Sequence, residues 1–277
     1  MQTEYERLKE CYQACRNITD FQPKLGLVLG SGLGALADEI QCEAVIPYDE
    51  IPGFPRSTVA GHQGRFVFGY LEQVPVVIMQ GRVHYYEGYT MQEVVRPIRL
   101  MKLLGADTLC LTNAAGGISP FLKPGTLMLL KDQISSFVPS PLIGANIEEL
   151  GARFPDMSEI YDKELRDKIK SAAETLDIPL QEGIYIQFSG PAYESPAEVR
   201  MAGLLGADAC GMSTTCEAVA ANHMGMKICG ISCITNMASG ISDKKLSHTE
   251  VQETADRVSA QFKQLIRLSV AEIGKEI

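Results

Sequence analysis

Short apolar runs, several of them almost free of polar residues, alternate along the chain with longer segments of helical periodicity. Strands that are apolar on both sides must be covered on both faces, as in parallel or mixed sheets between helices. The predicted strands span 25–29, 65–70, 74–80, 107–111, 126–130, 183–187, 207–212 and 226–234. The predicted helices span 3–17, 91–104, 162–176, 196–205, 215–224 and 248–272. This order predicts an α/β fold with a mixed, twisted central sheet flanked by helices.

No linker, repeat or low-complexity tract divides the alternation, and 277 residues suit one large α/β domain. We therefore expect a single domain over residues 1–277. The chain has 25 Lys and Arg against 34 Asp and Glu, a formal net charge of -9, and no basic run. This balance argues against nucleic acid or an anionic membrane as the partner, because both require a basic face.

The 8 cysteines include no C-x-x-C pair, and several interrupt apolar runs as small core residues do. This usage is typical of a reduced, cytoplasmic protein. The first twenty residues have the pattern of an amphipathic helix and lack the apolar centre of a signal peptide. No stretch approaches the ~18 apolar residues that would cross a bilayer.

Helix starts are marked by the Ser/Thr-x-x-Glu pattern of a capping box, which begins at Thr90, Ser195, Thr214 and Ser247. Loops that leave the carboxyl ends of strands meet at one crevice in an open α/β sheet, and helix N-termini there favour anions. The polar residues ahead of these caps are therefore expected to share one site. They are Arg82, His84, Tyr86, Tyr193, Glu194, Met212, Ser213 and Asn236.

A glycine-rich turn, Gly-Ser-Gly-Leu-Gly at 30–34, follows the first predicted strand. Its amides and the Ser31 hydroxyl could approach a phosphate closely, although a ligand-free tight turn is an equal alternative. An NAD-dependent oxidoreductase would use this turn for pyrophosphate and Asp49 or Glu50 for ribose. The spacing is G-x-G-x-G rather than G-x-G-x-x-G, and no Walker A Gly-Lys follows, so both nucleotide-binding fingerprints are weakened.

Arg82, His84 and Tyr86 would share a face if the segment 81–88 were extended. The planar fork of arginine matches phosphate oxygens, and His62, in the glycine-rich stretch 61–64, could reach a bound anion. Solvated surface loops are the alternative for both segments. Small residues at 113–117 follow another predicted strand and would let a flat ligand approach, or would serve a close packing contact.

These segments together form a recognisable pattern. It consists of 30–34, 61–64, 81–84 with 86–88, 112–117, 190–194, 211–213 and 235–236. In these motifs the chain resembles the trimeric, low-molecular-mass purine nucleoside phosphorylases over essentially its whole length. Tyr193, where many members have phenylalanine, and Met237, where vertebrate members have lysine, resemble the bacterial branch. Thr215 and Cys216 replace the Val-Pro pair common in the family.

The resemblance implies a role for each matching position. Phosphate would be held by Ser31, His62, Arg82, His84, Ala114 and Ser213. The purine would be bound by Ala114, Ala115, Gly116, Tyr193, Glu194 and Asn236, and the ribose by Tyr86, Met212 and His248. Catalytic roles would fall to His84, Glu194 and Asn236, and Phe154 would enter a neighbouring subunit's site.

The implied reaction is reversible phosphorolysis of inosine, guanosine and their 2′-deoxy forms in purine salvage, a pentosyltransferase activity of class EC 2.4.2.1. The resemblance further implies a homotrimer that requires no metal and no organic cofactor, with inorganic phosphate as co-substrate. A nucleoside-binding protein without catalysis is the remaining alternative. Such a protein would need Glu194 and Asn236 but not Ser31, Arg82, His84 and Ser213.

Overall fold

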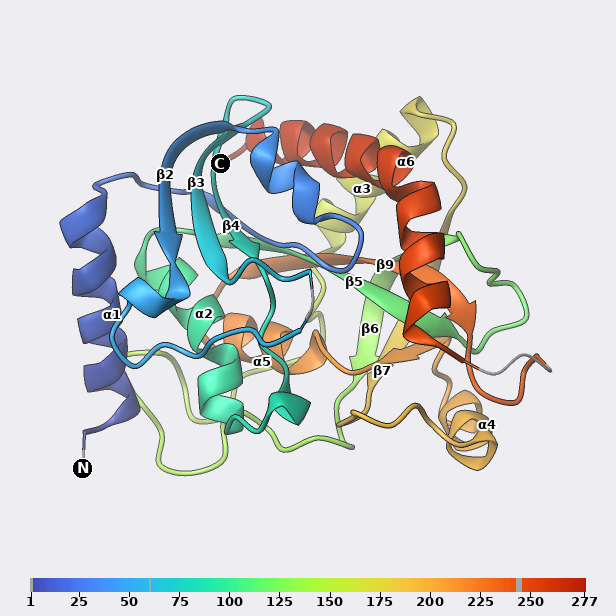
Figure 1. The fold of residues 1–277 in the computed structure, drawn as a ribbon. Helices are drawn as coiled ribbons and strands as arrows, with labels where there is room; N and C mark the ends of the chain where they lie inside the picture. The colour runs from blue at the N-terminus through green and yellow to red at the C-terminus, as the bar shows by residue number, and fades with distance from the viewer. Residues whose placement is uncertain (1, 60, 243–245) are drawn as a thin grey trace.

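A mixed β-sheet crosses the centre of the protein, with helices on both of its faces (Figure 1). The computed structural model describes residues 2–59, 61–242 and 246–277. The strands are β1 (Leu25–Val28), β2 (Gln41–Pro47), β3 (Arg65–Leu71), β4 (Val74–Gln80), β5 (Thr108–Gly117), β6 (Leu127–Ile134), β7 (Leu180–Gln187), β8 (Ala209–Gly211) and β9 (Lys227–Met237). The α-helices are α1 (Glu4–Ile18), α2 (Met91–Leu103), α3 (Lys163–Thr175), α4 (Pro196–Leu204), α5 (Thr215–His223) and α6 (His248–Gly274), and short 3-10 helices form η1 (Gly34–Asp38), η2 (Tyr48–Glu50) and η3 (Tyr85–Glu87). The predicted α/β class with a mixed central sheet is confirmed.

Alternate residues of β4 are buried in two different cores. Val77 and Met79 belong to the core that contains residues of α1, α2 and α5, whereas Val76 and Ile78 belong to the core that contains residues of α3 and α6. All of these side chains are fully buried. The sheet is therefore covered on both faces, which explains why its central strands are apolar throughout.

Strand β5 has different neighbours along its two halves. Its first half pairs in parallel with β1, as far as Leu111 opposite Val28. On the same edge its last residues pair in antiparallel fashion with β8, with Gly116 opposite Cys210. Strand β9 runs parallel to β5 along the other edge. The change of neighbour between Leu111 and Gly116 places a switch point at the carboxyl end of β1, where α/β sheets bind ligands.

The sequence pattern predicts no strand at Gln41–Pro47, where the structure has β2. This strand lies at the edge of the sheet and pairs only with β3 among the described strands. Its first residues are exposed, and Ile46 is its one buried side chain. Backbone hydrogen bonds to β3 hold it in place without an apolar face, so its composition is that of a loop.

Strands β5 and β9 extend beyond their predicted ends. They pair with each other as far as Gly117 opposite Met237. The small residues predicted to follow the strand thus lie within β5, because pairing with β9 continues past the polar residues Thr112 and Asn113. This extension carries Ala114, Ala115 and Gly116 toward the switch point as ordered backbone.

Of the four predicted capping boxes, two are complete and a third has only its serine contact. Thr90 and Ser195 form complete capping boxes with Glu93 and Glu198. The Ser247 side chain accepts a hydrogen bond from the amide of Glu250 at the start of α6. Thr214 makes no cap hydrogen bond, and its surroundings belong to the site described next.

Candidate active site

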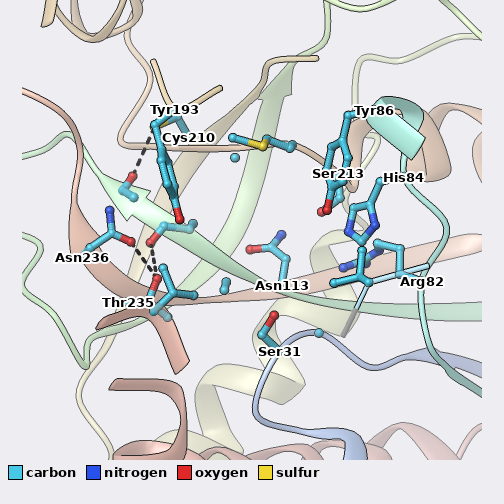
Figure 2. A pocket seen from close by; sticks show the side chains of 18 of the residues that line it. Ser31, Arg82, His84, Tyr86, Asn113, Tyr193, Cys210, Ser213, Thr235 and Asn236 are labelled. Atoms are coloured by element: carbon cyan, nitrogen blue, oxygen red, sulfur yellow. Dashed lines mark hydrogen bonds between the residues drawn. The ribbon is translucent and has the colours of Figure 1, made fainter. Parts of the chain in front are cut away.

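A cavity lies at the switch point beside β5 (Figure 2). The loops after β1 and β4, the last half of β5, the end of β8 and the end of β9 all contribute to its wall. The predicted site residues that line it are Ser31, His62, Arg82, His84, Tyr86, Ala114, Ala115, Gly116, Tyr193, Glu194, Met212, Ser213 and Asn236. Figure 2 shows Arg82, His84 and Ser213 near one end, and Tyr193 and Asn236 at the other. The structure thus brings these residues together around one space.

Gly30 allows the loop after β1 to approach β5 closely. Its amide donates a hydrogen bond to the Thr112 hydroxyl at 2.8 Å. A Cβ at this position would lie 2.7 Å from the Cα of Asn113, so any side chain would push the loop away. The loop leads into the 3-10 helix η1 and not into the α-helix on which a dinucleotide pyrophosphate would rest. This geometry favours a small anion over a dinucleotide beside Ser31.

Arg82 is buried at the anion end of the cavity, with 2% of its surface exposed. Its Nε donates to the Glu217 carboxylate at 2.9 and 3.1 Å, and its Nη1 donates to the Thr112 carbonyl at 2.9 Å. Its Nη2 is buried and has no hydrogen-bond partner in the described part of the chain. Arg82 is therefore oriented by two fixed contacts and keeps an unused donor.

The capping box predicted from Thr214 to Glu217 is wrong, for a reason that concerns the site. Thr214 has a positive φ of 84°, and its hydroxyl accepts a hydrogen bond from the Asn113 side-chain amide at 2.9 Å. Glu217 forms the buried ion pair with Arg82 instead of returning to the cap. Charge compensation of a buried guanidinium outweighs a capping contact, since an unpaired buried charge costs several kcal/mol.

Two histidines and a tyrosine stack along the anion side of the cavity. The rings of His62 and His84 are 5.6 Å apart, and those of His84 and Tyr86 are 4.8 Å apart. The segment is not extended as expected, because Tyr86 lies in η3, but the three predicted side chains of this loop still line one space. Burial, followed by the charge of His84, lowers the pKa of His62 to about 4. His62 is therefore a neutral hydrogen-bonding group at pH 7.

Glu87 orients His84. Its Oε1 accepts hydrogen bonds from the His84 amide at 2.6 Å and from the His84 Nδ1 at 3.0 Å. Burial acts to raise the pKa of Glu87, but hydrogen bonds from His84 and Thr58 outweigh it and lower the pKa to about 2. An ionised Glu87 accepts the Nδ1 hydrogen of His84, which leaves the other ring nitrogen, Nε2, available to a different hydrogen-bond partner.

Glu194 is the buried acid at the other end of the cavity, with 7% of its surface exposed. Its Oε2 accepts a hydrogen bond from the Cys210 thiol at 3.6 Å. Its Oε1 is buried and has no partner among the described residues. Burial raises the pKa of this carboxyl group above its ordinary value. Glu194 thus presents one unused acceptor to the cavity.

Asn236 is held in a fixed orientation near Glu194. Its Oδ1 accepts from the Thr235 hydroxyl at 2.9 Å, and its Nδ2 donates to the Met237 carbonyl at 3.1 Å. Because the amide nitrogen carries two hydrogens, one donor is left for a ligand. Figure 2 shows Asn236 and Thr235 beside each other at this end of the cavity.

Among the predicted site residues that the structure describes, Phe154 does not line the cavity. Phe154 is 88% exposed, and the Arg153 guanidinium lies 5.8 Å from the centre of its ring. His248 begins α6, and its side chain lies outside the described part of the structure. The next turns of α6 bring Val251 to the cavity wall.

Sequence reasoning did not assign a role to several residues that shape this site. Asn113, Thr235 and Cys210 line the cavity, and Glu217 and Glu87 hold its arginine and histidine. Asn113 and Thr235 stand inside the quoted motifs and could have been found there. Cys210 has the appearance of an ordinary core cysteine in an apolar strand, and only its contact with Glu194 distinguishes it.

The described residues contain no cluster of His, Cys, Asp or Glu side chains suited to hold a metal ion. Within the same residues, no helix combines the length and the apolar composition needed to cross a membrane.

The sequence profile of the phosphorylase superfamily matches residues 24–271. The chain belongs to this superfamily. It is 51% identical over 253 residues to purine nucleoside phosphorylase 1 of Geobacillus stearothermophilus, covering 91% of this chain and 92% of the relative. Identity to purine nucleoside phosphorylase 1 of Bacillus subtilis is 52% over 250 residues, covering 90% and 92%. The crystal structure of a schistosoma purine nucleoside phosphorylase in complex with hypoxanthine matches with a TM-score of 0.92 and 38% identity, over 98% of this chain and 99% of that chain.

Proposed function

We propose that the protein catalyses the reversible phosphorolysis of 6-oxopurine nucleosides to the free base and α-ribose 1-phosphate or its 2-deoxy analogue. One observation carries the proposal. Within the described residues, the Arg82 Nη2 donor and the Glu194 Oε1 acceptor are both buried without a partner, and both residues line one cavity. Cys210, which contacts Glu194, lies in Figure 2 at the end of the cavity opposite Arg82. A buried polar atom without a partner costs about 1–3 kcal/mol. A phosphate at one end and a purine N1–H at the other would satisfy both atoms.

Phosphate acts as the nucleophile in this proposal. Arg82 Nη2, the hydroxyls of Ser31 and Ser213, the amide of Ala114 and the ring of His84 would hold it, and His62 would close over it. Cleavage of the glycosidic bond builds positive charge on the sugar, as in other oxocarbenium-like transfers. The phosphate dianion beneath C1′ provides both the attacking oxygen and the opposing charge, and the fixed donors position it.

The leaving purine gains negative charge as the bond breaks. The free N–H of Asn236 can donate to the base where that charge collects, around N7 and O6. Ala115, Gly116 and Tyr193 would bound the base, while Tyr86, Met212 and His248 would contact the ribose. Asn236 is held by Thr235 and Met237 before the base arrives, so its donor requires little reorganisation.

Base choice follows from the acceptor that Glu194 presents. An ionised carboxylate only accepts hydrogen bonds, so it suits the N1–H of hypoxanthine or guanine and the 2-amino group of guanine. Adenine has a lone pair at N1, which would face the carboxylate. Mismatched buried hydrogen-bonding groups discriminate by as much as ~10⁴ to 10⁵. Inosine and guanosine are therefore the preferred substrates over adenosine.

In this proposal the whole chain forms one domain. Inorganic phosphate is the co-substrate of the reaction. Because phosphate and fixed donors meet both developing charges, the chemistry requires no metal ion and no organic cofactor. A cytoplasmic location belongs to the same proposal and is supported by 8 cysteines that are all free thiols.

The active assembly in this proposal is a homotrimer in which Phe154 completes the neighbouring site. The ring of Phe154 is 88% exposed in the single chain and is therefore accessible to a second subunit. Light scattering on the purified protein tests the assembly, and a monomer with full activity would contradict it.

The test of the function is an assay of hypoxanthine release from inosine, with and without phosphate and without added nicotinamide. Phosphate-dependent release is the expected result. Tight inosine binding without release would instead identify a nucleoside-binding protein, and a requirement for nicotinamide would identify an oxidoreductase.

A further inference from the structure

Cys210 lies next to Glu194, at the end of the cavity that is proposed to bind the purine base. Its side chain is 2% exposed, and its sulfur lies 3.6 Å from Glu194 Oε2 and 3.7 Å from the carbonyl oxygen of Gly116. Gly116 and Cys210 are opposite each other in the β5 and β8 pairing, so the backbone fixes the position of the thiol. Figure 2 shows Cys210 next to Tyr193, at the end of the cavity that holds Asn236.

The thiol lies close to the surface that a base would touch. A Cβ added to Gly116 would lie 3.4 Å from the Cys210 sulfur and 3.4 Å from the Asn236 Nδ2. The thiol and the amide therefore both lie within contact distance of the same point beside Gly116. Both polar groups reach the same part of the cavity wall from two different strands.

Cys210 remains a hydrogen-bond donor at neutral pH. Burial, together with the negative charge of Glu194, raises the pKa of its thiol well above the ordinary value. A thiolate beside the carboxylate would be strongly disfavoured, so the group is not a nucleophile. Its chemical contribution here is the S–H bond, a weak donor directed at an acceptor that is buried and charged when Glu194 is ionised.

The two oxygens of Glu194 consequently differ. Oε2 has the thiol, and Oε1 has no partner within the described residues. Hypoxanthine offers the carboxylate one donor, its N1–H. Guanine offers two adjacent donors, N1–H and the 2-amino group. With hypoxanthine bound, the thiol is thus the donor that satisfies the second oxygen, whereas guanine can satisfy that oxygen itself.

We propose that Cys210 is a positioning residue for Glu194 whose thiol supports the use of inosine more than the use of guanosine. This inference rests on the proposed function and adds to it a determinant of choice between two 6-oxopurines. Loss of the thiol would leave Oε2 buried and unpaired when hypoxanthine is the base. The 2-amino group of guanine would replace the lost donor.

The experiment measures kcat/KM for inosine and for guanosine on the same preparation of each variant. Cys210→Val keeps an apolar side chain of similar size, and Cys210→Ala removes the donor without adding bulk. In both, we expect kcat/KM for inosine to fall about three- to tenfold and that for guanosine to fall less than about twofold, in line with the loss of one hydrogen bond from a weak donor. Cys210→Ser restores a donor and should keep the ratio of the two substrates within about twofold of wild type.

Cys229→Val is the matched control. Cys229 is also a fully buried thiol with a carbonyl acceptor, the oxygen of Leu109 at 3.8 Å, but it has no contact with Glu194 and does not line the cavity. In Cys229→Val, the ratio of kcat/KM for inosine to kcat/KM for guanosine should equal that of wild type. Because both substrates are assayed on one preparation, any unfolded fraction cancels from the ratio, and Cys210→Ala serves if Cys210→Val does not fold.

Several results would overturn the inference. An unchanged ratio in both Cys210→Val and Cys210→Ala would show that the thiol only fills space. A larger loss for guanosine would show a steric effect on the 2-amino group, which has the opposite sign. If the wild-type protein released no base from either nucleoside, the proposed function itself would fail, and that failure is separate from an unchanged ratio in an active enzyme.

Discussion

Replacement of Glu194 by glutamine should invert the base preference of the enzyme. In the structure, the Cys210 thiol donates to Oε2, and Oε1 is the buried acceptor without a partner among the described residues. In Glu194→Gln the thiol selects the carboxamide oxygen as its acceptor. The side-chain NH₂ group is then the one that faces the base. It opposes the N1–H of hypoxanthine, whereas the N1 lone pair of adenine can accept from it.

The magnitude follows from two losses. A hydrogen bond to a charged group contributes about 1.5–3 kcal/mol, and a buried donor left without an acceptor costs about 1–3 kcal/mol. Together they amount to about 2.5–6 kcal/mol, or roughly 10²- to 10⁴-fold in kcat/KM for inosine. The kcat/KM for adenosine should rise instead, because the N1 lone pair of adenine then faces a donor rather than a carboxylate oxygen.

The assay follows base release from inosine and adenosine at saturating phosphate. Glu174→Gln, at an exposed position of α3, is the control for a neutralised carboxylate away from the cavity and should behave as wild type. Retention of inosine kcat/KM within about threefold in Glu194→Gln, with no gain for adenosine, would refute the assignment of Glu194 to the purine N1 position.

Other changes test the anion end and the assembly. Arg82→Ala should raise the KM for phosphate sharply and lower the stability by about 3–5 kcal/mol, because Glu217 loses its buried partner; an unchanged phosphate response would remove Arg82 from the clamp. The pKa of His62 is lowered to about 4 in the folded protein. As the pH falls from about 6.5 to 4, this residue therefore takes up a proton in the unfolded chain before it does so in the folded protein, which lowers the free energy of unfolding. Between those pH values, urea denaturation should show that wild type loses more stability than His62→Gln. An equal loss in the two proteins would contradict a neutral His62 ring in the folded state. Phe154→Ala should keep the fold, judged by circular dichroism, but reduce inosine turnover at least tenfold, since each site would lose its neighbour's ring; full turnover would place Phe154 outside the site.

Much of the fold was accessible from local sequence signals. The apolar runs identify the central strands because burial on both faces allows few polar residues, and β4 shows this directly in Val76 to Met79. The caps at Thr90 and Ser195 identify two helix starts because the hydrogen bonds are local. Strand β2 was not accessible, because an edge strand with one buried residue is held by pairing with a distant segment.

The site shows the same division between local and distant contacts. Arg82, His84 and Glu194 are recognisable by residue type and motif. The partner of Arg82 is not, because Glu217 lies 135 positions away and matches a capping box equally well. Cys210 and Glu194 are 16 positions apart, and Cys210 is brought to the segment after β7 by the parallel pairing of β7 with β8, in which Ile186 lies opposite Cys210. Contacts made through the sheet carry no local pattern, so only the folded structure reveals them.

The most direct measurement is a crystal structure of the protein with hypoxanthine and sulfate, a tetrahedral anion in place of phosphate. We expect the anion between the Ser31 hydroxyl and Arg82 Nη2, and the base with N1 on Glu194 Oε1. An anion bound at another surface, with hypoxanthine in place and Arg82 Nη2 still without a partner, would contradict the phosphorolytic site.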